Sequence, residues 1–236
     1  MGFIEDERYQ KFNARCLFFD RLDGTSLSPY DSLNTSFNVQ DNQNSVKQNL
    51  KIIKNSVNAD TLFTINQIHS DTIIEFDGKR HNADGIYTKQ RGVFLGIRFA
   101  DCTPIVFFDK KTELIAAVHA GWKGSYLKIA QKTVKLFKFY GANPKDILVT
   151  IGPHICKKCY EIKSDVAQKF LNSSLNFQNG KIYLDLTQEN KNQMLQEGID
   201  DKNIYDVNIC TFEDKRFFSY RRDRICGRNI GGIIKY

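Results

Sequence analysis

Apolar residues occur along the chain in short runs and in helical spacings that follow one another. Between residues 93 and 119 three apolar runs, VFLGIRF, PIVFFD and ELIAAVH, have the length of strands and are separated by turn-forming residues. We expect these runs to form adjacent strands of one central sheet. The segment ILVTIGP, which ends at Gly152 and Pro153, predicts a further strand.

Helical spacings occur outside the predicted strands. Apolar residues recur at intervals of four, three and four positions over residues 45–57, which predicts an amphipathic helix whose capping box begins at Ser45. The turn HAGWKGS is followed by a helical pattern that ends near Gly141. Two more helices are expected, one after Ser164 and one over residues 187–197. The mixture of strands and helices predicts an α/β fold.

The chain has the size of one large domain. A chain of 236 residues can bury a core without disulfides or structural metals. No Ser/Gly linker, proline-rich tract or fixed-period repeat divides the sequence. We therefore expect a single domain over residues 1–236.

Charge and hydropathy restrict the classes of partner. The formal net charge is +7, but Lys and Arg are interleaved with acidic residues, which favours a solvated basic surface over a nucleic-acid site. No run approaches the roughly 20 apolar residues of a membrane span, and no signal-peptide pattern is present. We expect a cytoplasmic protein with no nucleic acid and no membrane partner. In that reducing compartment the six cysteines are expected to be thiols, available for metal binding or catalysis.

Three residues that suit a metal site stand beside predicted turns: His69 in NQIHSD, Cys102 in RFADCTP and His119 at the end of ELIAAVH. Two imidazoles and a thiolate suit zinc, and three protein ligands leave the fourth position open, as in a catalytic site. Two other interpretations use the same residues. Cys102 can be a buried apolar residue beside histidines that bond to the backbone, or the nucleophile of a thiol hydrolase activated by a neighbouring histidine.

Six segments identify a family resemblance. NQIHS, ADGIYT, FADCTPIVFFD, VHAGWKGS, IGPHICKKCYEI and FFSYRRD together resemble the laccase-domain family of bacterial and animal proteins, in the family's order. The resemblance covers nearly the whole chain, and ADCTP together with HAGWKG is highly specific. It implies a layered α/β fold with a mixed sheet and a zinc ion bound by His69, Cys102 and His119.

The resemblance also implies an activity. It is that of a purine nucleoside phosphorylase, a transferase acting on adenosine, inosine and methylthioadenosine, with hydrolytic adenosine deamination. The expected partners are therefore a small-molecule nucleoside and phosphate, and we expect a monomer or small homo-oligomer. Older descriptions call such proteins polyphenol oxidases, but four histidines cannot build several copper centres. Copper stays an alternative to zinc at the single site.

Other activities remain open at this point. Some members of the family are described as peptidoglycan editing factors, which implies an amidase that acts on a nucleotide-linked muropeptide with Cys102 as the nucleophile. A binding module without enzymatic activity is a third alternative.

Phosphate-binding candidates come from two loops. FFDRLDGTS resembles the family's TRxGGxS motif, so that Arg21 matches its arginine, although Asp20 and Asp23 replace the usual Thr and Gly. Backbone amides of the turn that contains Gly121 are further candidates, because the N-termini of helices bind anions. We expect Arg21 to help bind phosphate.

Several residues carry two interpretations each. Arg221 in SYRRD is a substrate-binding candidate, whereas Arg221 and Arg222 can instead form a surface ion pair with Asp223. Trp122 can stack on a purine or belong to the core. Asp101 can orient a metal ligand or cap its turn.

Cys156 and Cys159 form a C-x-x-C pair, which is typical of a redox motif or of half a structural zinc site. No second pair is apparent in the sequence. Since the family resemblance covers this segment, we interpret Cys159 as packing or as part of a substrate loop, and His154 as a local variation. His81 lies in a polar segment and is expected to be exposed.

Overall fold

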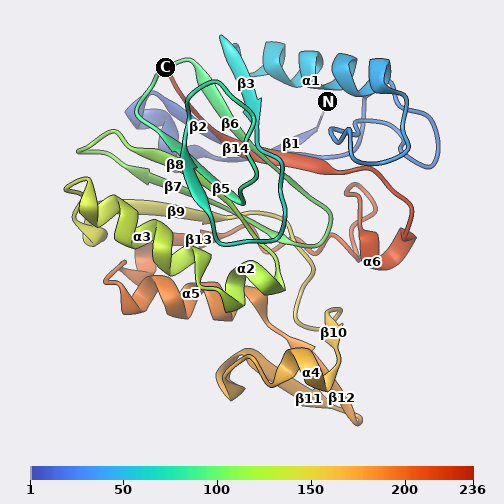
Figure 1. Ribbon diagram of the computed structural model, residues 1–236, viewed down its shortest axis with the longest axis vertical. Coiled ribbons are helices and arrows are strands. Elements are labelled where there is room, and N and C mark those ends of the chain that lie inside the picture. Colours follow the sequence, from blue (N-terminus) through green and yellow to red (C-terminus); the bar gives the residue numbers. More distant parts are fainter. Residues whose placement is uncertain (1) are drawn as a thin grey trace.

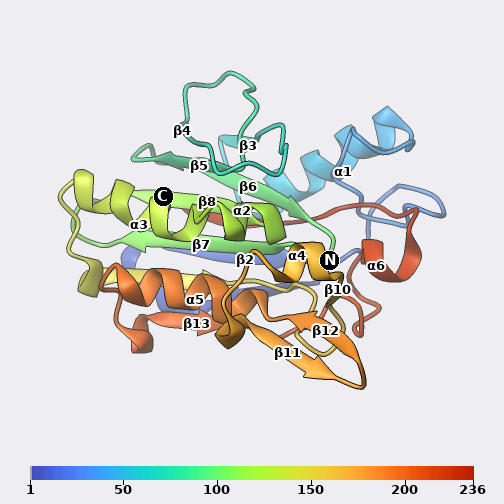
Figure 2. The same ribbon diagram turned by 60° about the horizontal axis from the view of Figure 1, so that its bottom comes forward.

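The computed structural model describes residues 2–236 and contains two large β-sheets that pack face to face (Figure 1 and Figure 2). The first sheet has the strand order β1-β2-β14-β6-β3. Its strands are β1 (Phe3–Asp6), β2 (Ala14–Phe19), β14 (Asn229–Lys235), β6 (Val93–Phe99) and β3 (Thr61–Thr64). The second sheet has the order β13-β9-β7-β8-β5-β4. Its strands are β13 (Ile204–Asp206), β9 (Ile147–Ile151), β7 (Thr103–Asp109), β8 (Ile115–Ala120), β5 (Gly85–Thr88) and β4 (Ile73–Glu75).

The central strands are buried on both faces. Every residue of β6, β7, β8 and β14 is buried, which explains why these strands are continuous apolar runs rather than alternating ones. Between the sheets, Phe18 of the first sheet and Phe108 of the second belong to the same core cluster. Phe18 packs so closely on β14 that a Cβ at Gly231 would lie 2.2 Å from its ring. A larger residue at Gly231 would therefore separate the ring from the strand.

Helices cover the two outer faces, so the molecule has four layers (Figure 2). Helix α1 (Gln43–Ser56) packs Ile53 against Phe94 of the first sheet. On the other side, α3 (Ile129–Phe139) packs Phe137 on Phe107, and α5 (Leu186–Gln196) contributes Met194 to the same cluster. This arrangement follows from amphipathic helices that bury their apolar faces on the sheets.

A smaller three-stranded sheet projects from the main body below α5 and α2 (Figure 1). Its strands are β10 (Glu161–Ile162), β12 (Lys181–Leu184) and β11 (Leu175–Gln178), and α4 (Ser164–Ala167) lies beside them. Leu184 packs with Ile155 and Leu186 in a cluster of its own. Two short helices complete the elements near the site, α2 (Trp122–Tyr126) and α6 (Tyr220–Asp223).

The expected α/β fold with mixed sheets is confirmed, since β9 pairs in parallel with β13 and antiparallel with β7. The three runs between residues 93 and 119 do form strands, but they are not adjacent in one sheet. β7 pairs with β8, whereas β6 belongs to the other sheet. The expectation of one central sheet was wrong because both sheets are buried on two faces, and an apolar run does not reveal which sheet it joins.

Helix boundaries also differ from the expected ones. Helix α1 begins at Gln43, and the side chain of Asn42, rather than Ser45, caps it by accepting hydrogen bonds from the N–H groups of Asn44 and Ser45. The helix expected after HAGWKGS is divided into α2 and α3, because Lys128 adopts a φ of 64°. Among residues 2–236 no helix has the length and apolarity needed to cross a membrane.

Candidate metal centre and its cavity

Two turns and a strand end bring His69, Cys102 and His119 together. His69 lies in the loop after β3 with a φ of 60°, Cys102 immediately precedes β7, and His119 is the penultimate residue of β8. One ligand atom from each residue lies within 4.8 Å of the others. The two imidazole rings are 5.0 Å apart, edge to face. This set of one thiol and two imidazoles matches the donors that zinc prefers, and the close approach of the three donors fits one ion.

Glycine is required beside the thiol. A Cβ at Gly121 would lie 2.7 Å from Sγ of Cys102, closer than a side chain can approach without displacing the sulfur atom. Gly121 is the residue that connects β8 to α2. The turn can therefore pass over Cys102 only because the residue at this position has no side chain.

The carboxylate of Asp84 forms hydrogen bonds with both histidines. Its buried carboxylate accepts a hydrogen bond from Nδ1 of His119 at 2.9 Å and from the backbone N–H of His69 at 3.0 Å. It also accepts hydrogen bonds from the backbone N–H and the hydroxyl of Ser70. Because Nδ1 of His119 donates to Asp84, Nε2 is left to bind a metal, as in many carboxylate–histidine–zinc arrangements.

The ionisable groups of the centre stabilise one another's charged forms. Burial raises the pKa of the Cys102 thiol, but His119 and His69 outweigh it and lower the pKa to about 6. Burial lowers the pKa of His119, but Cys102 and Asp84 outweigh it and raise the pKa to about 9. Burial also raises the pKa of Asp84, while hydrogen bonds from His119 and Ser70 lower it to about 2. Without a metal, Cys102 and His119 therefore form a thiolate–imidazolium pair at neutral pH.

The three ligand residues open into a cavity of about 440 Å³. Arg98, Tyr220 and Arg228 line the same cavity. A space of this size accommodates a small molecule such as a nucleoside.

Two guanidinium groups give the cavity positive charge. Arg98 is 5% exposed and donates to the Thr64 hydroxyl and the Ile65 carbonyl. Arg228 donates to the carbonyls of Cys226 and Gly227. Within residues 2–236 neither guanidinium pairs with a carboxylate. Two arginines that line one cavity and pair with no carboxylate among the described residues favour an anionic ligand.

The surroundings of Arg98 disfavour its positive charge. Burial, with the nearby guanidinium groups of Arg80 and Arg228, lowers the pKa of Arg98 to about 10. An anion in the cavity would offset both the lost hydration and the repulsion between the cations.

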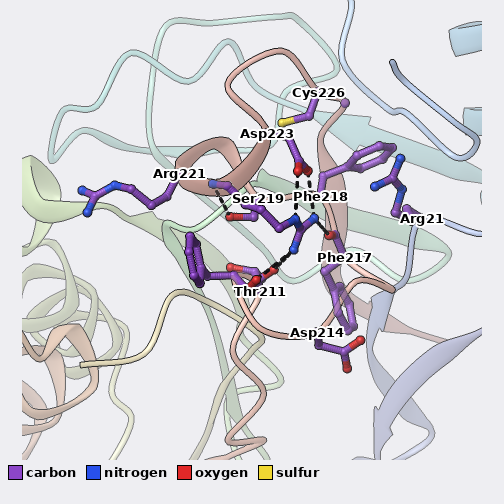
Figure 3. A network of polar contacts seen from close by, with 12 residues as sticks. Arg21, Thr211, Asp214, Phe217, Phe218, Ser219, Arg221, Asp223 and Cys226 are labelled. Atoms are coloured by element: carbon purple, nitrogen blue, oxygen red, sulfur yellow. Dashed lines mark hydrogen bonds and ion pairs between the residues drawn. The ribbon is translucent and has the colours of Figure 1, made fainter. Parts of the chain in front are cut away.

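Arg21 lies outside this cavity. Its guanidinium forms an ion pair with Asp31 at 3.0 Å and stacks on Phe218, with 4.4 Å between the guanidinium carbon and the ring centre. Figure 3 shows Arg21 beside Phe218. The structure therefore does not bring Arg21 to the His69–Cys102–His119 group, and its contacts with Asp31 and Phe218 are those of a residue that fastens its loop.

Arg222 is the centre of a polar network in the segment around α6 (Figure 3). It pairs with Asp223 at 2.8 Å and donates to the backbone carbonyls of Thr211 and Phe217. Arg221 points away from this network, donates to the Glu161 carbonyl and lies over the ring of Tyr160. Arg222 therefore has the structural role that was the alternative interpretation, and Arg221 contacts the base of the small sheet rather than the cavity.

Two other candidates have structural contacts. Trp122 packs against the apolar cluster of Ile155 and Leu184 and does not line the cavity. Asp101, with a φ of 91°, accepts hydrogen bonds from the Thr211 hydroxyl at 2.8 Å and from the backbone N–H of Arg221 at 2.6 Å. Asp101 therefore fastens the turn that presents Cys102.

The other histidines lie apart from the centre. His81 is exposed and pairs with Asp77, as expected from its polar segment. His154 is buried, with Nδ1 near the Gly152 carbonyl and Nε2 near the Thr187 hydroxyl, each at 2.9 Å.

Asp84, Arg98 and Arg228 were not selected from the sequence. Asp84 lies in ADGIYT, where a single acidic residue before a strand has no distinctive spacing. Arg98 interrupts the apolar strand VFLGIRF, and a charged residue inside a buried strand was the signal that could have identified it. Arg228 follows a loop whose position near the cavity depends on the fold.

The fold and site define a layered α/β protein with a His/Cys/His ligand set that lines a cavity. The model of a family described as multi-copper polyphenol oxidoreductase laccase matches residues 15–235, and the chain belongs to this family.

The chain is similar over most of its length to two purine nucleoside phosphorylases in sequence and to one solved structure in fold. The chain is 35% identical to a purine nucleoside phosphorylase of Haemophilus influenzae, over 92% of each chain. It is 33% identical to purine nucleoside phosphorylase YlmD of Bacillus subtilis, over 88% of this chain and 83% of the relative. The crystal structure of a Bacillus licheniformis hypothetical protein YfiH matches with a TM-score of 0.93 and 31% identity, over 99% of this chain and 96% of that one.

Proposed function

We propose that the chain is a zinc-dependent purine nucleoside phosphorylase, which also deaminates adenosine. The observation that carries the proposal is the shared cavity, in which His69, Cys102 and His119 face the same space as Arg98 and Arg228. A metal centre can supply a Lewis acid and two guanidinium groups can hold phosphate, so together they would support phosphorolysis of a nucleoside. Relatives over nearly the full length of the chain are named purine nucleoside phosphorylases, which supports the same activity.

Zinc is the proposed ion because the ligands are one thiol and two imidazoles. When bound, zinc supplies a Lewis acid with one position open to the cavity. His119 is held in a fixed tautomer by Asp84, so its orientation is set before a ligand arrives.

Arg98 and Arg228 are proposed to bind phosphate. In phosphorolysis a phosphate oxygen forms a bond to C1′ of the ribose, the C1′–N9 bond breaks, and the departing purine takes up a proton. Two fixed guanidinium groups can hold the phosphate beside the sugar and neutralise its charge. This assignment replaces Arg21, whose guanidinium is bound to Asp31 outside the cavity.

Adenosine, inosine and methylthioadenosine are the proposed nucleosides. Tyr220 lines the cavity and is half exposed, so its ring can stack on a purine. We assign this contact to Tyr220 in place of Trp122, which packs against the small sheet. Adenosine deamination requires water to add at C6 of the purine and ammonia to leave, with no part for phosphate.

The test is a product analysis with adenosine, inosine and methylthioadenosine, each with and without phosphate. The phosphorylase gives free base and the corresponding ribose 1-phosphate in equal amounts, only when phosphate is present, whereas deamination gives inosine in its absence. Prior removal of metal with a chelator should abolish base release. Base release that is independent of phosphate would contradict the proposal.

A second function is favoured by one observation. Cys102, His119 and Asp84 form a connected thiol, imidazole and carboxylate set in which the thiol's pKa is lowered to about 6, the arrangement of a nucleophilic cysteine. Such a residue could hydrolyse an amide of a nucleotide-linked muropeptide. Metal-free protein should be active in that reaction and inhibited by added zinc, the reverse of the dependence expected for the phosphorylase.

A further inference from the structure

A second group of potential ligands lies apart from the centre described above. Ligand atoms of Cys156, Cys159, Cys210 and Glu213 all lie within 4.8 Å of one another. The sequence shows only the first pair as a C-x-x-C motif. The fold places Cys210 and Glu213, which have the same two-residue spacing, beside it.

Each pair is carried by a tight turn. The carbonyl of Cys156 accepts hydrogen bonds from the N–H groups of Cys159 and Tyr160, and the carbonyl of Cys210 accepts one from Asp214. A turn of this kind points two side chains that are three positions apart to the same side. Two such turns facing each other form the usual frame of a closed four-ligand zinc site.

The two turns are fixed relative to each other. The N–H of His154 donates to the carbonyl of Ile209, and the N–H of Thr211 donates to the carbonyl of His154. The N–H of Cys156 donates to Sγ of Cys210 at 3.3 Å. The backbone therefore positions the donors before any ion is bound, which reduces the conformational entropy lost on binding.

We propose that Cys156, Cys159, Cys210 and Glu213 bind a second zinc ion, with a structural role. Three thiolates and one carboxylate fill a tetrahedral shell and leave no open position. Zn–S bonds of about 2.3 Å place tetrahedral donors about 3.8 Å apart. Sγ of Cys159 and Oε1 of Glu213 are already 3.5 Å apart, so small side-chain rotations close the shell.

The fourth ligand is the carboxylate of Glu213. Within residues 2–236 Glu213 forms no ion pair with Lys or Arg, and its side-chain hydrogen bond is with the Cys159 thiol. Burial and the neighbouring thiols raise the pKa of Cys159, and burial raises that of Cys210. Zinc binding would form three Zn–S bonds and one Zn–O bond, and each thiol that carries a proton would release it to solvent.

A zinc ion here would also restrain the loop of the first centre, because residues adjacent to two of its ligands form hydrogen bonds with Asp101. Ile155, which precedes Cys156, donates its N–H to the carbonyl of Asp101, and Thr211, which follows Cys210, donates its hydroxyl to the Asp101 carboxylate. Asp101 in turn precedes Cys102. The second ion would thus clamp the two segments that hold the Cys102 turn.

The test is the zinc content of purified full-length chains after dialysis against a weak chelator. The proposal predicts two zinc ions in the wild type and one each in Cys102→Ser and Cys156→Ser, with none in the double variant. Cys226→Ser is the matched control, because this buried cysteine belongs to neither group, and it should keep two. Cys102→Ser removes a ligand of the first centre only. The zinc that remains in this variant therefore reports on the second site, whether or not the protein proves to be a phosphorylase.

X-ray absorption of Cys102→Ser protein keeps the test independent of whether Cys156→Ser folds. The remaining zinc should have three sulfur neighbours and one oxygen. A chain with one zinc that is lost entirely in Cys102→Ser would overturn the proposal. So would a mass 2 Da below that of the reduced chain, because it would show a disulfide in place of the ion.

Discussion

Nδ1 of His119 lies 2.9 Å from the carboxylate of Asp84, which also accepts the backbone N–H of His69. One buried carboxylate thus fixes the ring of one proposed metal ligand and the backbone of another. Such outer contacts typically change metal affinity by about 10–100-fold when they are removed.

Asp84→Asn should therefore lower the affinity for zinc by about 10–100-fold, measured by competition with a coloured chelator. The surface provides a matched control in Asp77→Asn, because Asp77 pairs with the exposed His81 at the same 2.9 Å distance. The control should leave zinc affinity unchanged. Equal affinities for Asp84→Asn and wild type would show that the contact does not support a metal ligand.

The pH dependence of zinc binding follows from two pKa values. Below about pH 9 His119 carries a proton that zinc must displace, whereas Cys102 is already a thiolate above about pH 6. Affinity at the first centre should therefore rise as pH increases between these values, with a release of protons. Calorimetry of the Cys156→Ser chain in buffers of different ionisation enthalpy measures this release. An affinity that is flat over this range would contradict a protonated His119.

Arg228→Gln should raise KM for phosphate by about 10–100-fold, the loss of one charge-assisted hydrogen bond of about 1.5–3 kcal/mol. KM for the nucleoside should change much less. Arg216→Gln is the control, because Arg216 forms an exposed ion pair with Asp214 away from the cavity. An equal effect of the two substitutions on phosphate KM would remove Arg228 from the phosphate site.

Gly121→Ala should displace Cys102, since the added Cβ would lie 2.7 Å from its sulfur. We expect the first zinc and base release to be lost while the melting temperature of the metal-free chain falls by a few degrees, as for a local clash of about 1–3 kcal/mol. Metal analysis and thermal unfolding of the same sample separate the two effects. A Gly121→Ala protein that binds zinc fully would show that the turn can shift away from Cys102 with little loss of free energy.

The strands could be predicted from local pattern, because apolar runs of strand length mark buried strands. The three metal-ligand candidates came from the family resemblance of NQIHS, ADCTP and HAGWKG, and the fold places their ligand atoms within 4.8 Å of one another. Sheet membership could not be predicted in this way. Strand β6 has the same buried pattern as β7, yet it pairs with β14 in the other sheet.

The rest of the site depends on contacts between distant segments. Arg98 and Arg228 are 130 positions apart and meet because β6 pairs with β14. Likewise Cys156 and Cys210 come together through a backbone bridge at His154. Arg21 is the opposite case. Its position in a motif suggested a phosphate ligand, but in the fold its guanidinium forms an ion pair with Asp31.

The most direct measurement is adenine release from adenosine by metal-free wild-type and Cys102→Ser protein, each titrated with zinc at saturating phosphate. We expect wild-type activity to appear with zinc, to require phosphate and to yield ribose 1-phosphate in equal amount, while Cys102→Ser stays inactive at every zinc concentration. Full adenine release by metal-free wild type, or by the Cys102→Ser protein, would contradict a zinc-dependent phosphorylase at this centre.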